Sequence, residues 1–259
     1  MRITVLGKSP AWQDAGGACS GYVVEHGGTR LLLECGNGVF GRLREHCSYH
    51  EVDAVVISHL HADHCLDLMP YAYALTYGQA GPVAGGAPAD RPALLLPEYD
   101  GLATIRRLAG LWGSETLIEE AFAPAFHTPG GTLEIGELRL RFVPVPHYIP
   151  TCAIDIAPAA GGPRFTFGAD CGPNEAVVDL ARGSELLFLE ATLEQPEASG
   201  PRGHLTAAEA GELARRAAVR RLVLTHLSDE LDQQATLEAA SRGFGAPVEI
   251  ARAGAEYVL

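Results

Sequence analysis

Long hydrophobic runs are missing from this sequence. Hydrophobic residues make up 47% of its 259 residues, which is enough for a sizeable core. However, no uninterrupted apolar stretch approaches the roughly 18 residues that a membrane-spanning helix requires. The first apolar stretch, residues 2–7, is too short for a secretory signal, and no small-residue cleavage site follows it. We therefore expect a cytoplasmic protein that neither spans nor binds a membrane.

Closely spaced cysteine pairs are also missing. The six cysteines include no Cys-x-x-Cys pair. In a reducing cytosol we expect free thiols, most of them serving as small buried hydrophobic side chains. Cys65 and Cys171 directly follow candidate metal ligands, so we expect them near the site described below without assigning them as ligands.

Positive charge is scarce. The chain has 19 Lys and Arg against 32 Asp and Glu, a formal net charge of −13. Such a protein repels a polyanion, so long nucleic acid is a poor partner unless a local basic patch exists. The clearest basic clusters, Arg106-Arg107 and the arginines of 215–221, fall on expected helices or their ends and indicate solvated faces.

One stretch concentrates potential metal ligands. Residues 53–58 form a strand-like run that ends in His59-x-His61-x-Asp63-His64. Four ligand-type side chains within six residues are costly to desolvate together unless a cation pairs with them. The motif therefore predicts a metal site at the end of a buried strand.

The order of the remaining segments indicates an α/β protein. In the first half we expect strands at 2–7, 21–26, 29–34, 53–58 and 93–96, and helices at 39–47, 66–77 and 101–111, with Asn37 capping the first helix. In the second half we expect strands at 132–135, 137–143, 152–156, 164–167, 185–190, 221–225 and near Gly254, and helices at 206–218 and 232–242. Two packed sheets with helices outside would satisfy this order. No clean boundary divides the chain, so we expect one domain, residues 1–259, with two similar halves.

Three later residues share the position of the motif, because each follows an expected strand. They are His147, Asp170 and His226. Imidazole and carboxylate ligands suit Zn²⁺, with Mn²⁺ and Fe²⁺ as alternatives. Seven ligands are too many for one tetrahedral ion and fit two, held about 3.5–4 Å apart around a shared hydroxide. We expect His59, His61 and His147 around one ion, Asp63, His64 and His226 around the other, and Asp170 as the bridge.

With these residues the sequence resembles the metallo-β-lactamase-fold hydrolases over essentially the whole chain. The resemblance implies an αββα sandwich, in which two mixed β-sheets pack together with helices on the outer faces and a dinuclear site at the sheet edge. The fold does not define the reaction. True β-lactamases have a Cys where this chain has Asp170, and the oxygen-reducing di-iron proteins have an acidic residue in place of His61, so neither branch fits.

Further motifs resemble the tRNase Z branch and its related phosphodiesterases. They are Leu189-Glu190-Ala191-Thr192, Gly203-His204-Leu205-Thr206 and Leu224-Thr225-His226-Leu227-Ser228. In that branch a Glu and a His outside the metal ligands act as a pair, which implies Glu190 and His204 here. His204 would protonate the leaving alkoxide, and Glu190 would orient its ring and favour its protonated form. The predicted catalytic residues are Asp63, His204 and Glu190.

Two features depart from tRNase Z. Its long tRNA-gripping arm lies between the positions matching His147 and Asp170, where this chain has only the 22 residues 148–169, enough for a short hairpin. Glu34 stands where relatives usually carry Asp, and we expect it to hydrogen-bond to a ligand His with a longer reach. The missing arm and the acidic charge favour small or cyclic phosphodiesters, including cyclic nucleotides, over tRNA.

We therefore predict a dinuclear-metal phosphodiesterase in which the bridging hydroxide attacks a small phosphodiester. Relatives in this branch are commonly dimers, so a homodimer is expected. A lactone or thioester hydrolase on the same metals is a second hypothesis, and it would not need the Glu190–His204 pair. A third is a metal-binding sensor or partner protein without turnover.

Two loops and four histidines complete the expectations. Trp12, in the loop 8–17, is either a packing anchor or a wall of a pocket. The Gly-, Ala- and Pro-rich stretch 78–92 is either a lid or a surface insertion. The histidines that lack a strand-end position are expected on the surface; they are His26, His46, His50 and His127.

Overall fold

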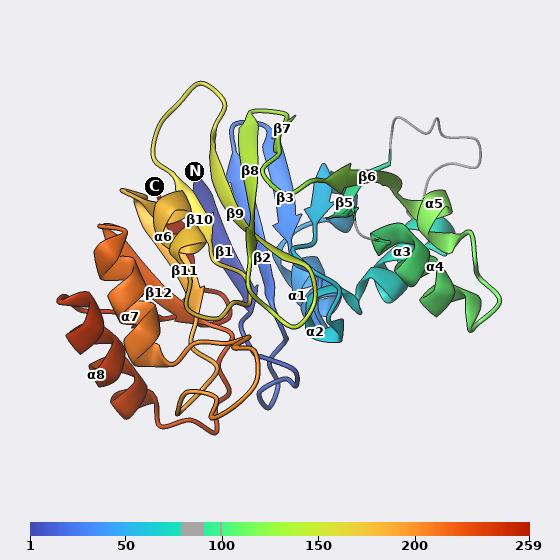
Figure 1. The fold of residues 1–259 in the computed structure, drawn as a ribbon. Coiled ribbons are helices and arrows are strands. Elements are labelled where there is room, and N and C mark those ends of the chain that lie inside the picture. The colour runs from blue at the N-terminus through green and yellow to red at the C-terminus, as the bar shows by residue number, and fades with distance from the viewer. Residues whose placement is uncertain (79–90, 99) are drawn as a thin grey trace.

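Two seven-stranded β-sheets pack face to face, and helices cover both outer faces (Figure 1). The computed structural model describes residues 1–78, 91–98 and 100–259. The first sheet has the order β14-β1-β2-β3-β4-β5-β6, and the second has the order β13-β12-β11-β10-β9-β8-β7. Consecutive strands thus build each sheet, except that β14 returns to pair with β1 beside the N-terminus. The predicted αββα architecture is confirmed.

The first sheet is mixed, with antiparallel pairing through β1, β2 and β3 and parallel pairing from β3 to β6. Its strands are β1 (Arg2–Gly7), β2 (Gly21–His26), β3 (Thr29–Leu33), β4 (Ala54–Val56), β5 (Ala93–Pro97), β6 (Ala123–His127) and β14 (Glu256–Val258). The helices of this half are α1 (Val39–His46), α2 (Ala62–Cys65), α3 (Leu68–Tyr77), α4 (Gly101–Gly110) and α5 (Leu117–Ala121), with a 3₁₀ turn η1 (Tyr49–Glu51).

The second sheet repeats this scheme, with antiparallel pairing from β7 to β10 and parallel pairing from β10 to β13. Its strands are β7 (Thr132–Ile135), β8 (Leu138–Val145), β9 (Thr151–Pro158), β10 (Phe165–Phe167), β11 (Leu186–Glu190), β12 (Arg221–Thr225) and β13 (Glu249–Ile250). Its helices are α6 (Glu175–Ala181), α7 (Ala207–Arg216) and α8 (Gln233–Phe244).

Three hydrophobic layers hold the sandwich together. The central layer lies between the sheets and includes Tyr22, Phe167 and Phe188. The ring centroid of Tyr22 lies 5.4 Å from that of Phe167 and 5.4 Å from that of Phe188. The strand positions alternate between this layer and an outer one, as the period of two in a β-strand requires. One outer layer joins the first sheet to α1, α3, α4 and α5, and the other joins the second sheet to α6, α7 and α8.

Most expected elements are present, with some corrections. The capping box that starts α7 is formed by Thr206 and Glu209. Asn37 does not cap α1, because Gly38, at φ 89°, takes the N-cap position. The expected helix 66–77 is α3, which begins two residues later, at Leu68. The short helix α2, which carries Asp63 and His64 of the motif, was not expected, and no sequence pattern that we used indicated α5, β6 or α6. The possible lid at 78–92 falls largely on residues 79–90, which lie outside the described residues.

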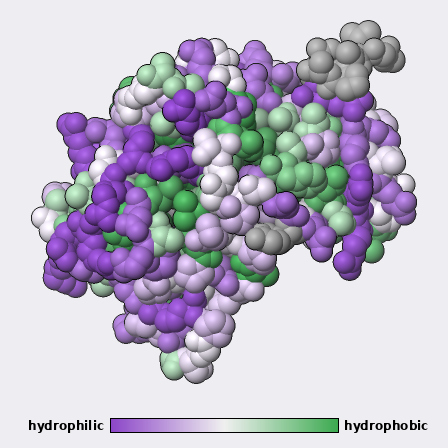
Figure 2. Space-filling model, turned by 45° about the horizontal axis from the view of Figure 1, so that its top comes forward, coloured by the Kyte–Doolittle hydropathy of each residue, from purple (hydrophilic) through white to green (hydrophobic). Residues whose placement is uncertain are grey.

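On the face shown in Figure 2, hydrophobic residues gather in a band between largely hydrophilic regions. In the described part of the chain, no helix combines the length and apolar character needed to cross a bilayer. Two exposed aromatic side chains, Trp12 and Tyr148, line a cavity. That cavity lies at the edge of the sandwich where strands of both sheets end.

Candidate metal centre and active site

The His-rich motif spans the loop after β4 and the first residues of α2, with His61 at the N-cap and Asp63 and His64 on the helix. His59, Asp63 and His64 are buried, and His61 is partly buried. The chain after β3 supports this segment, because the Cys35 amide donates to the His64 carbonyl at 2.8 Å. A Cβ atom at Gly36 would lie 1.9 Å from the Asp63 carbonyl oxygen, so only glycine fits there. The backbone of β3 and its following loop therefore fixes where the motif side chains point.

The second sheet supplies three more side chains at the same edge. His147 follows β8, Asp170 follows β10 and His226 follows β12. β10, β11 and β12 are parallel, so their carboxyl ends meet at one edge. His226 and Ala169 have φ values of 53°, a left-handed conformation that is uncommon for non-glycine residues and is often found at functional sites.

The seven predicted ligands come together in two groups that share Asp170. In each group the candidate ligand atoms all lie within 4.8 Å of one another. His147 Nε2 lies 3.0 Å from His61 Nδ1, and His226 Nε2 lies 3.0 Å from an Asp63 carboxylate oxygen. The groups are His59, His61, His147 and Asp170, and Asp63, His64, Asp170 and His226.

The far ring nitrogens of these histidines show which atom faces the centre. His147 Nδ1 lies 2.7 Å from the Gly203 carbonyl, which can only accept, so His147 carries its proton on Nδ1. His64 Nδ1 contacts the buried Glu34 carboxylate at 3.2 Å, as predicted for Glu34, and His226 Nδ1 contacts the Thr192 hydroxyl at 2.8 Å. The Nε2 lone pairs of these rings are thereby turned inward, which is the tautomer that a metal ligand needs.

The electrostatics of the cluster also favour a central cation. Burial lowers the pKa of His59, with a further contribution from His64. Burial opposes ionisation of Asp170, but positive charge on His226 and His64, when these rings are protonated in place of binding a metal, outweighs it and holds the pKa of Asp170 well below its usual value. Ionised carboxylates and inward lone pairs in a buried space are stable only with positive charge between them. The donor set of imidazoles and carboxylates therefore fits divalent metal ions.

Next to the cluster, Glu190 and His204 form the predicted pair. His204 Nδ1 lies 2.8 Å from Glu190 Oε1. Burial alone would lower the pKa of His204, but the hydrogen bond and charge of Glu190 outweigh it and raise that pKa. Glu190, His204 and His226 could form a third metal-binding group. Direct hydrogen bonds already satisfy Glu190, so this group needs no cation.

Thr192 joins the pair to the cluster, and the sequence motif alone did not assign it a role. Its hydroxyl lies 2.7 Å from Glu190 Oε2 and 2.8 Å from His226 Nδ1. Because the Thr192 hydroxyl donates its proton to Glu190, it accepts from His226, which places the His226 proton on Nδ1. The only sequence signal was its place two residues after Glu190 at a strand end.

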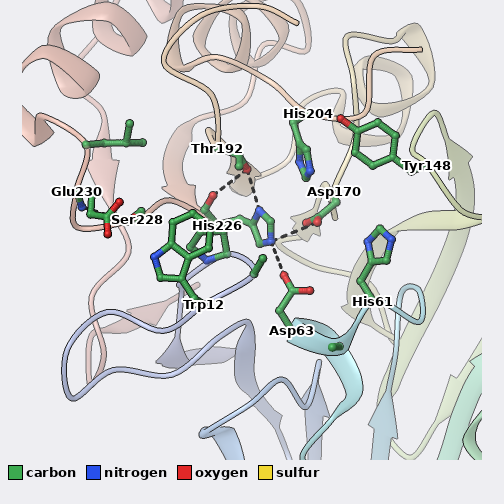
Figure 3. Close-up of a pocket in the computed structure, with 14 residues that line it drawn as sticks. Trp12, His61, Asp63, Tyr148, Asp170, Thr192, His204, His226, Ser228 and Glu230 are labelled. Carbon is green, nitrogen blue, oxygen red and sulfur yellow. Dashed lines mark hydrogen bonds and ion pairs between the residues drawn. The ribbon is translucent and has the colours of Figure 1, made fainter. Parts of the chain in front are cut away.

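His204 and four residues of the cluster, His61, Asp63, Asp170 and His226, line one cavity of about 480 Å³ (Figure 3). Trp12 lines it from the loop after β1, so Trp12 is a pocket wall, one of the two predicted alternatives. Tyr148 lines it beside His204, with ring centroids 5.5 Å apart. A Cβ atom at Gly203 would lie 2.4 Å from the Tyr148 ring, so glycine is required for this packing.

One histidine prediction was wrong. His127, expected on the surface, ends β6 and is only 1% exposed. Its Nε2–H donates to the Ile57 carbonyl at 2.8 Å, and its ring stacks on Phe142. It belongs to neither metal-binding group.

All six cysteines are free, as expected, and Cys65 donates to the His61 carbonyl at the edge of the cluster.

Comparisons with known proteins agree with this architecture. The probable metallo-hydrolase YhfI of Bacillus subtilis is 28% identical over 254 residues, covering 98% of each chain. A crystal structure of YhfI superposes with a TM-score of 0.85 at 24% identity, covering 99% of this chain and 98% of that one. A ribonuclease Z of Methanopyrus kandleri is 29% identical over 274 residues, covering 90% of this chain and 89% of the relative.

A diphosphatase of the PhnP family shares the fold, with a TM-score of 0.73 at 21% identity, covering 99% of this chain and 97% of the other. The family model described as the beta-lactamase superfamily domain matches residues 29–227, a span that contains all seven clustered side chains, Glu190 and His204. The chain therefore belongs to the beta-lactamase superfamily and is one of its metallo-hydrolases.

Proposed function

We propose that this metallo-hydrolase is a phosphodiesterase that uses two divalent cations and acts on small or cyclic phosphodiesters. The observation that carries the proposal is that the two ligand groups, joined by Asp170, open into a cavity that is also lined by His204, the partner of Glu190. A hydrolase with a single metal ion would not need the second ligand group. An ester with a good leaving group would not need His204 as a general acid.

The seven clustered side chains would hold the two ions, and Zn²⁺ suits the donor set best. When bound there, the ions would neutralise charge on the phosphoryl oxygens and activate water as the nucleophile. The chain itself fixes the ligands through Glu34, Gly203 and Thr192, which hold the far nitrogens of three histidines.

His204 is placed to act on the leaving group. Its Nδ1–H donates to Glu190, which leaves Nε2 for the substrate, and the side chain is partly exposed in the cavity. A phosphodiester releases an alkoxide, which needs a proton, and a His with a raised pKa carries that proton near neutral pH. Glu190 keeps the ring in this orientation and stabilises its positive charge.

The segment between His147 and Asp170 supports a small substrate. It contains β9, a short turn and β10, which pair antiparallel. No additional helix or strand is present among these described residues, so this segment offers no extended arm for a folded RNA. The net charge of −13 also disfavours a long polyanion. A cytoplasmic location and a homodimer are also part of the proposal, and light scattering tests the homodimer.

The test combines metal analysis with a substrate panel. Purified protein should contain about two metal equivalents, and it should hydrolyse methyl 4-nitrophenyl phosphate and small cyclic phosphodiesters. Chelation should abolish turnover, and added Zn²⁺ or Mn²⁺ should restore it. Faster turnover of a lactone or thioester than of every phosphodiester would instead support the alternative hydrolase. Bound metal with no turnover of any ester would support a sensor.

A further inference from the structure

The cavity has two chemically different ends. At one end lie His204 and the ligand side chains of His61, Asp63 and Asp170. At the other end lie the Trp12 indole and the Ser228 and Glu230 side chains (Figure 3). The first end would bind an anion, whereas the second combines a flat apolar face with a negative charge. A ligand that fills the cavity therefore needs one anionic end and one planar end that donates hydrogen bonds.

The loop that carries Trp12 is held in place. The Lys8 ammonium donates to the Leu227 carbonyl at 2.7 Å and pairs with Asp14, and its side chain is only 12% exposed. Asp14 also accepts from the Asp229 amide at 3.0 Å. These contacts tie the loop after β1 to the loop after β12. The wall is therefore preorganised, which reduces the entropy that ligand binding costs.

The side chains of Trp12 and Glu230 at this end of the cavity are available to a ligand. Trp12 is 53% exposed, so part of its indole is open to a stacking ligand. Glu230 is exposed, and within the described residues its carboxylate makes no ion pair or hydrogen bond; only its backbone amide is bound, by the Ser228 hydroxyl at 3.1 Å. A free carboxylate in a site for an anionic substrate needs an explanation.

We propose that Trp12 and Glu230 form a subsite for a nucleobase that bears an exocyclic amine. This inference rests on the proposed phosphodiesterase and names its substrate class as small nucleotide diesters. The indole would stack on the base, as aromatic side chains do with any base. The carboxylate only accepts hydrogen bonds, so it favours an amine and disfavours a carbonyl oxygen at the same place. It also repels substrates with a second anionic group at that end.

Cyclic CMP and cyclic UMP form a matched pair for the test. They have the same size and charge, but cytosine presents an amine where uracil presents a carbonyl oxygen. With the metal-loaded protein we expect kcat/KM to be about tenfold higher for cyclic CMP. In Glu230→Gln the ratio should approach one, because an amide both donates and accepts. Glu194→Gln, which changes an exposed carboxylate outside the cavity lining, is the control.

The stacking contact is tested by Trp12→Ala. KM should rise about tenfold or more for every cyclic nucleotide and stay unchanged for methyl 4-nitrophenyl phosphate, whose ring is the leaving group on the His204 side. Trp12→Phe should recover most of the affinity. Trp12 is exposed and lies outside the hydrophobic core, so we expect the variant to stay folded, and an unchanged Tm checks this.

The failures of the two proposals are distinguishable. If the metal-loaded protein cleaves no phosphodiester, the proposed function is wrong. If it cleaves methyl 4-nitrophenyl phosphate but no cyclic nucleotide, or if the Trp12 and Glu230 variants leave nucleotide KM values and the cyclic CMP to cyclic UMP ratio unchanged, the subsite is wrong and the phosphodiesterase stands.

Discussion

Glu190 is the side chain on which the predicted acid depends. It is buried, and its two oxygens accept from the Cys171 and Leu205 amides, from His204 and from Thr192. A carboxylate with this many donors cannot rotate without losing several hydrogen bonds. The orientation of His204 is therefore set by backbone atoms of two loops as well as by side chains.

Replacing His204 by Ala should separate acid catalysis from metal binding. We expect kcat for an alkoxide-leaving phosphodiester to fall about 10²- to 10⁴-fold, the usual contribution of a general acid. Metal content should stay unchanged, because His204 belongs to neither of the two groups that share Asp170. Steady-state kinetics with elemental analysis measures both, and His50→Ala, on the exposed 3₁₀ turn, is the control. Loss of metal in H204A would mean that His204 is a ligand.

Replacing Thr192 by Val should weaken the link between the acid and the cluster. The variant keeps the shape but removes the hydroxyl that lies between Glu190 and His226. We expect lower kcat together with a roughly 10- to 100-fold loss of metal affinity, as is typical when the partner of a ligand His is removed. Titration with a metal chelator gives the affinity. Thr192→Ser should restore both values, and failure of Ser to do so would assign Thr192 a packing role.

At the scale of elements, the site could be predicted because its residues directly follow the ends of strands. His59, His147, Asp170 and His226 each follow a strand whose apolar pattern is readable, and parallel strands end at one edge. The elements that were missed are short or irregular. β6 contains Pro124, which cannot donate to a ladder and is tolerated here because β6 is the edge strand. Missing β6 also placed His127 on the surface.

The buried His127 predicts a pH-dependent loss of stability. Burial lowers its pKa from 6.5 to about 4, so the folded protein holds this ring neutral while the unfolded chain protonates it. Above pH 6.5 this residue costs nothing; as the pH falls from 6.5 to about 4 it should remove up to about 3 kcal/mol from the free energy of unfolding. His127→Gln can keep the hydrogen bond to Ile57 and should lack this loss.

Urea unfolding at several pH values measures the difference between wild type and H127Q. A chelator in all samples removes any contribution from pH-dependent metal binding. His50→Gln, at an exposed position, should follow the wild-type curve. Parallel curves for wild type and H127Q between pH 6.5 and 4 would show that the ring is protonated in the folded state.

For the whole molecule, the αββα layering and the residues of the cluster could be predicted, but the cavity could not. Motif residues reveal themselves by type and by their place after strands. The cavity wall depends on how the loop after β1 meets the loop after β12, through Lys8, Asp14 and backbone atoms 227–229. Such contacts join residues more than 200 positions apart and leave no local pattern. This is why Trp12 had two interpretations and Glu230 had none.

Because each ligand group draws side chains from both sheets, bound ions should hold the sandwich together. Ions that bind only the folded state stabilise it by about 2.7 kcal/mol each at 100 times their Kd. Two ions would therefore raise Tm on the order of 10 °C for a domain of this size. Calorimetry with and without chelator measures the shift. Asp170→Asn removes the carboxylate that both groups share, so in D170N added Zn²⁺ should shift Tm by a small fraction of the wild-type value. A full shift in D170N would show that the two groups bind metal independently of Asp170.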